Sequence, residues 1–141
     1  MEETLIRGKI RNRDFARQLR DFSGLRWGNI TPTDIDGYFE IGDRIFVFIE
    51  IKYGTTEVPF GQKLALERLV DIIGETRDAI LIIGSHHDEA GTDIDVAPCV
   101  VREYRTSNVW HSPTKKTTIV ELINQFSDYI GDMGNSVAFN A

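Results

Sequence analysis

Residues 33–53 read TDIDGYFEIGDRIFVFIEIKY, and this stretch decides the fold. In its second half the odd-numbered positions from Ile45 to Ile51 carry only isoleucine and valine, a pattern typical of a β-strand. In its first half the odd-numbered positions from Ile35 to Ile41 carry apolar residues or glycine, and the turn-forming residues Gly42-Asp43-Arg44 separate the two halves. The stretch therefore predicts a β-hairpin, in which Thr33–Ile41 pairs with Ile45–Tyr53.

The register of this hairpin follows from its apolar faces. Directly opposed residues point to the same side of a sheet, so odd-numbered positions must pair with odd-numbered ones. Pairing Ile41 with Ile45 across a three-residue loop satisfies this condition and brings Asp36 opposite Glu50. The main competing register is shifted by two residues and sets Asp36 against Lys52.

Two opposed carboxylates make this hairpin chemically unusual. In the favoured register the Cβ atoms of Asp36 and Glu50 lie roughly 4.5–5.5 Å apart, and like charges in that position destabilise a sheet. A hard cation would compensate, and Mg²⁺ suits one or two carboxylates plus water and phosphate, with Mn²⁺ as the alternative. Lys52 points to the same side as Glu50 and could orient a water molecule or stabilise charge on a phosphate. Asp34 also faces this side, as a further metal ligand or as a partner of Lys52.

The motif Asp36-Gly37 on one strand, followed by Glu50-Ile51-Lys52 at the end of the next, resembles the PD-(D/E)XK nuclease superfamily. The resemblance is to its small phage-type members, such as recombination exonucleases and Holliday junction resolvases. It implies that Asp36 and Glu50 bind Mg²⁺ and that Lys52 assists hydrolysis. It also implies a restriction-endonuclease-like three-layer sandwich with an α-β-β-β-α-β core, in which residues 25–31 or the Asp36 strand supply the first of three meander strands.

The chain departs from this family in two places. Many members add an acidic residue from the first helix, for which Asp14 and Asp21 are the candidates here, and the choice between them stays open. One branch of the family has Gln-x-x-x-Tyr on the helix that follows the lysine strand. In this chain Gln62 is followed by Leu66, so the resemblance carries over Gln62 alone as a catalytic residue.

The remaining elements follow from hydrophobic spacing and from helix start and stop signals. Their order of helix, hairpin, helix, strand, strand, helix predicts a single α/β domain over residues 1–141, built around one mixed sheet. The further elements are a helix over 8–22, a helix from Pro59 to Gly74, a doubly buried strand over 79–84, a polar loop over 85–98, a strand over 99–104, and a helix that Thr118 and Glu121 start with a capping box and that ends near Ile130.

Charge is distributed unevenly along the chain. The net charge is −6, yet residues 7–26 contain seven basic and two acidic residues, so that segment carries +5 and the rest carries −11. A basic face on an acidic body fits a nucleic-acid partner, although a solvated amphipathic helix is the simpler interpretation. The residues expected to hold backbone phosphates are Arg11, Arg13, Arg17 and Arg20, with Lys63 added if the second helix flanks the cleft.

Several classes of protein are excluded. Cys99 is the only cysteine, so there is no internal disulfide. No secretory signal, membrane-spanning run or glycine-rich phosphate loop is present, so we expect a cytoplasmic protein (in the host cytoplasm if viral) that uses no membrane and no nucleotide cofactor. His86, His87 and His111 lack the companions of a zinc site. Trp27 and Trp110 could belong to the core or stack on bases.

The sequence therefore predicts a Mg²⁺-dependent nuclease that hydrolyses DNA phosphodiester bonds in phage or bacterial DNA metabolism. A chain of 141 residues has no room for a separate sequence-reading domain, so we expect structure-selective cleavage, as in junction resolvases or end-processing enzymes of DNA recombination. A resolvase would need two coordinated cuts and hence a homodimer. The alternatives are a catalytically silent nucleic-acid-binding module of the same fold and a protein-interaction domain.

Overall fold

The structure is a computed structural model that describes residues 19–131 and residue 139. The chain divides into two units between Thr33 and Asp34. In residues 19–33 the backbone forms one isolated bridge, between Trp27 and Ile30. All the helices and strands of the described residues lie in the second unit, which therefore carries the fold.

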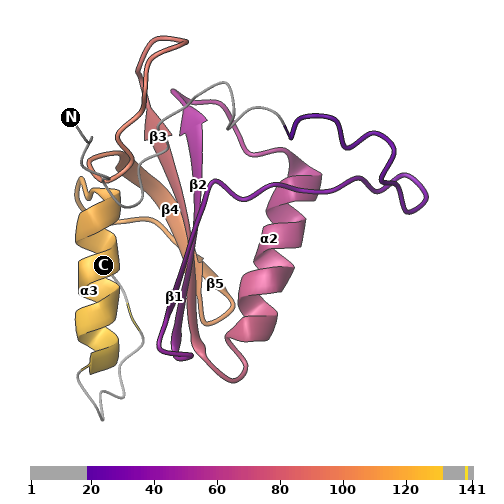
Figure 1. Cartoon of the computed structure of the whole chain (residues 1–141). Helices are drawn as coiled ribbons and strands as arrows, with labels where there is room; N and C mark the ends of the chain where they lie inside the picture. Colours follow the sequence, from indigo (N-terminus) through magenta and orange to yellow (C-terminus); the bar gives the residue numbers. More distant parts are fainter. Residues whose placement is uncertain (1–18, 132–138, 140–141) are drawn as a thin grey trace, which may run out of the picture. The chain divides into compact units, whose positions relative to one another are not determined.

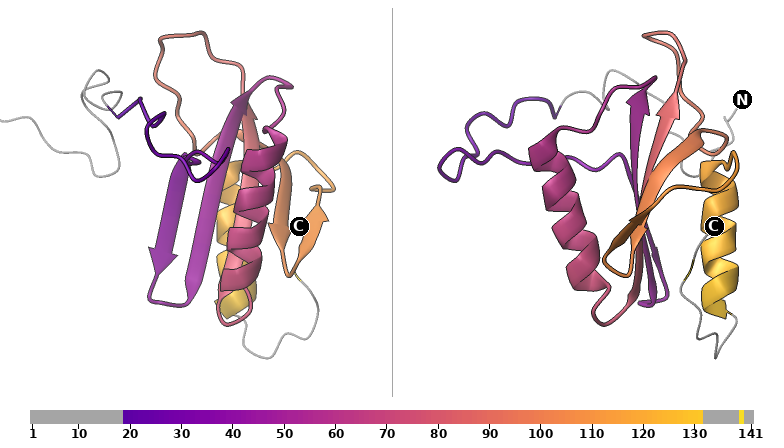
Figure 2. Two further views of the ribbon diagram at one scale, coloured as in Figure 1. Left: turned by 90° about the vertical axis from the view of Figure 1, so that its right-hand side faces the viewer. Right: turned by 180° about the vertical axis from the view of Figure 1, so that it is seen from behind.

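Five strands form one mixed sheet in the order β1-β2-β3-β4-β5. β2 and β3 run parallel, and the other neighbouring strands pair antiparallel. Figures 1 and 2 show α2 on one face of this sheet and α3 on the other. This α/β sandwich around a mixed sheet agrees with the sequence-based expectation. Its elements are β1 (Gly37–Ile41), β2 (Ile45–Tyr53), α2 (Phe60–Ile73), β3 (Asp78–His86), β4 (Val100–Thr106), β5 (Val109–His111) and α3 (Ile119–Gly131).

The register predicted for the hairpin is confirmed over the whole of β1. The pairs run from Ile41–Ile45 to Gly37–Ile49, across the predicted three-residue loop. Gly42 and Asp43 take positive φ angles of 56° and 57°, which let the chain reverse there. The competing register, shifted by two residues, is therefore wrong.

β1 is shorter than the predicted strand, because it begins at Gly37 and not at Thr33. The Oδ2 atom of Asp36 accepts a hydrogen bond of 2.8 Å from the backbone N–H of Ile51. A side chain thus satisfies an N–H group that a longer β1 would have paired. The main-chain ladder ends at the Gly37–Ile49 pair, and Asp36 is held beside the end of β2.

β3 is buried on both faces, as its continuous apolar run predicts. Ile80 and Ile82 are fully buried in the cluster under α3, and Leu81 is fully buried in the cluster under α2. Parallel strands need a long crossover connection, and α2 provides it between β2 and β3. Leu66 and Val70 of α2 pack onto the sheet, so β2 and β3 have both faces covered.

Both predicted helices of the second unit are present. α2 follows Pro59, as predicted, but Gly74 at its end keeps a right-handed φ of −63° and not the left-handed conformation expected of a terminal glycine. At α3, the Oγ1 atom of Thr118 accepts a hydrogen bond of 3.3 Å from the N–H of Glu121, which confirms the predicted helix start. The sequence pattern does not reveal β5, since three residues are too few to show an alternation.

The segment before the hairpin differs from expectation. The predicted helix over 8–22 is wrong at its end, because residues 19–22 are not helical; its other residues lie outside the described ones. The Oδ1 atom of Asp21 accepts hydrogen bonds from the N–H (3.1 Å) and the Oγ (2.6 Å) of Ser23, and such local bonding competes with a helix. Residues 25–31 form only the isolated bridge, so within the described chain two strands precede α2.

We expect Gly84→Ala to destabilise the protein by about 1–3 kcal/mol. A Cβ atom at this position would lie 2.9 Å from Ile119 Cδ1, 3.0 Å from Ile51 Cδ1 and 3.1 Å from the carbonyl oxygen of Val100, so these tightly packed neighbours would have to shift. Thermal unfolding measures the effect. Gly61→Ala is the matched control, because nothing lies within 4 Å of that position on α2, and its melting temperature should be unchanged or slightly raised.

Candidate active site

Glu50 is the unusual residue of the sheet. It lies in β2, and only 1% of it is exposed to solvent. Its neighbour on the same face, Phe48, belongs to the apolar cluster under α2. A carboxylate in such surroundings loses most of its hydration and needs compensating partners.

The compensation reaches only one of the two carboxylate oxygens. Gln62 of α2 donates a hydrogen bond of 2.9 Å from Nε2 to Glu50 Oε1, and Lys52 Nζ lies 3.3 Å from the same atom. The other oxygen, Oε2, is buried and has no hydrogen-bond partner among the described residues. Buried oxygens of this kind are rare and need an explanation, of which a bound cation is one. The residues present thus fit a metal ion at Oε2.

The electrostatics point the same way. Burial raises the pKa of Glu50 above its ordinary value of 4.5, and the charge of Asp36 raises this pKa further. Lys52 and Gln62 lower it by smaller amounts. Two carboxylates therefore lie close enough to repel each other, as the register argument requires. A divalent cation between them would remove this repulsion.

The other predicted acids have different surroundings. Asp34 is exposed, and Gln62 Nε2 lies 3.5 Å from its Oδ1, so Gln62 lies between Asp34 and Glu50. Asp21 bonds to Ser23, and Asp14 lies outside the described residues. In the described part of the chain, no group of three or more His, Cys, Asp or Glu side chains could hold a metal. A site at Asp36 and Glu50 would need water and substrate as further ligands, as Mg²⁺ commonly does.

Of the residues expected to bind phosphates, the structure describes Arg20 and Lys63. Arg11, Arg13 and Arg17 lie outside the described residues, and Arg20 is exposed. Lys63 Nζ is 2.7 Å from Glu103 Oε1 and lies 4.5 Å from the centre of the Trp110 ring. The side chain of Lys63, which comes from α2, is therefore held against Glu103 of β4 and Trp110 of β5 and does not extend freely into solvent.

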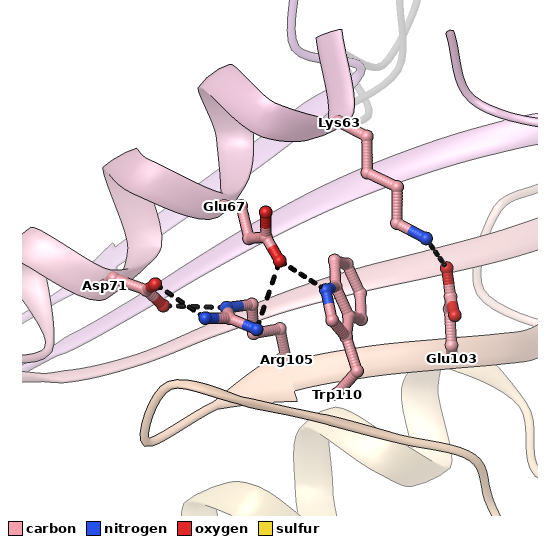
Figure 3. Close-up of polar contacts among 6 residues, drawn as sticks. All are labelled: Lys63, Glu67, Asp71, Glu103, Arg105 and Trp110. Atoms are coloured by element: carbon pink, nitrogen blue, oxygen red, sulfur yellow. Dashed lines mark hydrogen bonds and ion pairs between the residues drawn. The ribbon is translucent and has the colours of Figure 1, made fainter. Parts of the chain in front are cut away.

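A polar network fixes α2 over β4 and β5 (Figure 3). Arg105 donates two hydrogen bonds of 2.8 Å to the carboxylate of Asp71, which raises the pKa of Arg105. Glu67 accepts from the indole of Trp110 at 2.6 Å and pairs with Arg105 at 3.1 Å. Trp110 is half-buried and packs against the cluster under α2, as the core interpretation expects. With this anchoring, the first turn of α2, which carries Gln62 and Lys63, is held over the sheet.

A cavity of about 780 Å³ lies where β2 leads into the loop before α2, and the β3 neighbours of Glu50 and Lys52 line it. In the parallel pairing of β2 with β3, Glu50 is opposite Ile83 and Lys52 is opposite Ser85, and both of these β3 residues line the cavity. Arg102 also lines it and holds the β2–α2 loop by donating to the carbonyl oxygens of Gly54 and Thr56. The sequence alone does not reveal this cavity, because its residues come from β3, β4, α2 and the β2–α2 loop and meet only in the folded chain.

No family model matches this chain, and no curated protein or solved structure is significantly similar to it. Within the described residues there is no helix of the length and apolar character that crossing a bilayer requires. What the site does must therefore be inferred from its own chemistry.

We expect Glu50→Gln to raise the melting temperature in the presence of chelator. Because the pKa of Glu50 is raised in the folded state, ionisation of Glu50 costs stability as the pH rises above about 4.5. The amide carries no charge and removes this cost. The gain should therefore be larger at neutral pH than in mild acid, as thermal unfolding at several pH values would measure. A variant that is equally or less stable at neutral pH would show that the ion pair with Lys52 outweighs the burial.

Proposed function

We propose that this protein is a metal-dependent nuclease of the PD-(D/E)XK type, which hydrolyses phosphodiester bonds in DNA. The observation that carries the proposal is the buried Glu50 carboxylate. One of its oxygens lies within reach of Lys52 and Gln62, and the other has no partner in the described part of the chain. A carboxylate that serves only the fold has no reason to leave one oxygen unsatisfied.

The arrangement of elements supports the proposal in part. In the family that the motif resembles, the acid and the lysine lie at the end of a strand that is followed by a helix. Here Glu50 and Lys52 lie near the end of β2, which leads into α2. Asp36 is bound to the backbone of the same strand at Ile51. We propose on these grounds a restriction-endonuclease-like core, with β1 and β2 as the strands of the meander in the described residues.

Each residue of the site has a chemical task in this proposal. Asp36 and Glu50 would hold Mg²⁺ or Mn²⁺, which when bound draws charge from a phosphate oxygen and makes a water molecule more acidic. Lys52 donates to the phosphate or to the attacking water. Gln62 holds Glu50 Oε1, so that Oε2 keeps its direction. In the reaction a bond forms between the water oxygen and phosphorus and the bond to the leaving oxygen breaks. A proton of the attacking water passes to solvent, and the leaving oxygen takes up a proton from solvent to become a hydroxyl group.

The substrate and setting are also proposals. The basic segment with Arg11, Arg13, Arg17 and Arg20 would bind backbone phosphates. Lys63 is already paired with Glu103 and is not assigned this task. Junction cleavage would require a homodimer, whereas end processing would not. We propose a cytoplasmic enzyme of DNA recombination or repair.

Cleavage of linear duplex, single-stranded and four-way-junction DNA tests the function. We expect cleavage with Mg²⁺ and none with chelator. Lys52→Ala should lower the rate by roughly 10²-fold or more, the range seen when one donor to a developing charge is removed. Lys115→Ala, which removes an exposed lysine outside the site, is the matched control and should cleave like the unaltered protein. If binding to DNA is tight but no cleavage occurs, the silent nucleic-acid-binding module is the better description.

The two aspartates should differ. Asp36→Asn should abolish cleavage, because the amide offers the metal no charge. The fold should be kept, since the amide oxygen can still accept the hydrogen bond from the Ile51 N–H. Asp34→Asn should leave measurable activity, since Asp34 is exposed and among the described residues its side chain contacts Gln62 and not Glu50 or Lys52. Mg²⁺ should also raise the melting temperature of the unaltered protein and not that of Glu50→Gln, because a ligand of the folded state stabilises it. The opposite order of the two aspartates would assign the metal to Asp34.

A further inference from the structure

The cavity beside the candidate active site has the size and position of a ligand site. Its volume of about 780 Å³ lies within the range of roughly 300–1,000 Å³ that small-molecule sites occupy. It opens where the parallel strands β2 and β3 end and the β2–α2 loop begins, and in α/β sheets ligands bind outside the carboxyl ends of such strands. None of the tasks proposed for Asp36, Glu50 and Lys52 uses this space.

The lining favours a nucleobase over a phosphate. Its charged side chains balance: Lys63 and Arg102 are basic, and Glu57 and Glu103 are acidic, so no excess positive charge attracts an anion. Lys63 and Glu103 also neutralise each other at 2.7 Å. A base needs apolar surface for its faces and donors or acceptors for its edge. Val58 and Phe60 supply apolar surface, and Ser85 and Glu103 supply polar groups.

An exposed aromatic ring stands at this cavity. Phe60, the first residue of α2, lines the cavity and is 82% exposed. A phenylalanine exposed to this degree contributes little to folding. Stacking on a base is worth about 1–3 kcal/mol and does not depend on sequence. Phe60 is therefore placed to stack on a base that enters the cavity.

The spacing connects this cavity to the proposed cleavage site. Ser85 is the direct neighbour of Lys52, and Ile83 is the direct neighbour of Glu50, on a strand about 4.8 Å away. If the scissile phosphate lies at Glu50 and Lys52, the base of the adjoining nucleotide would therefore lie at the cavity. A base in a duplex is stacked and paired, and it can enter a pocket only after it has left the helix.

We propose that this cavity binds one unpaired base next to the scissile phosphate, so that the substrate is single-stranded or frayed DNA. This inference rests on the proposed nuclease function and specifies its substrate. Within an intact duplex the base pair would have to open first, which costs free energy, so we expect an intact duplex to be cut more slowly.

Fluorescence of a single-stranded oligonucleotide that contains 2-aminopurine tests the inference, with chelator present so that no cleavage occurs. Binding should change the fluorescence when the probe is unpaired, and the fully paired duplex should show no such change. Phe60→Ala should weaken binding of the single strand roughly tenfold and remove most of the fluorescence change. Phe60→Trp should restore both, because it keeps an aromatic face. Ile72→Ala, which shortens another exposed apolar residue of α2 (63% exposed), should bind like the unaltered protein.

The outcomes separate this inference from the proposed function. Equal binding by Phe60→Ala and the unaltered protein, or equal fluorescence changes with duplex and single strand, would overturn the base site even if Mg²⁺-dependent cleavage is found. Base binding that depends on Phe60, together with no cleavage of any DNA, would leave the base site standing and overturn the nuclease. Circular dichroism would check that each variant is folded, which the exposure of Phe60 leads us to expect.

Discussion

The parallel pairing of β2 with β3 is the constraint on which the other features of this protein depend. Two strands that are consecutive in the sheet and parallel cannot be joined by a tight turn, so the chain must cross the face of the sheet between them. α2 makes that crossing, and Leu66 and Val70 of α2 cover Phe48 and Leu81. The same coverage removes Glu50, two residues along from Phe48, from water. The helix that completes the core thus also creates the desolvated carboxylate.

A carboxylate in this position opposes the stability of the fold. Moving an ion out of water costs several kcal/mol. The contacts of Lys52 and Gln62 offset this cost at Oε1 but not at Oε2. Asp36 adds a repulsive charge that an apolar residue would avoid. Departures from favourable packing and charge in an otherwise consistent fold tend to lie at functional sites. Glu50 is such a departure, in a sheet whose other buried residues are almost all apolar.

The cavity has a related origin. Arg105 and Trp110 hold α2 through Asp71 and Glu67 (Figure 3), and Phe60 and Lys63 of its first turn line the cavity. Arg102 ties the β2–α2 loop to β4 through the carbonyl oxygens of Gly54 and Thr56. The space between this loop and the sheet is therefore kept open by polar contacts, and Phe60 stands at its border. The buried carboxylate and the cavity are two consequences of one crossover.

The sequence by itself determined the hairpin and favoured its register, because the side chains of a strand alternate with a period of two, so that odd-numbered positions pair with odd-numbered ones. The strand pairing in the structure decided between the two alignments that meet this condition. The sequence also determined the doubly buried strand and the start of α3 for similar local reasons. Only the tertiary structure decided that Gln62 bonds to Glu50, that Lys63 pairs with Glu103 and that Ser85 stands beside Lys52. Those contacts join residues from different elements, and they depend on how the crossover helix lies on the sheet. Local alternation and spacing carry no information about that placement.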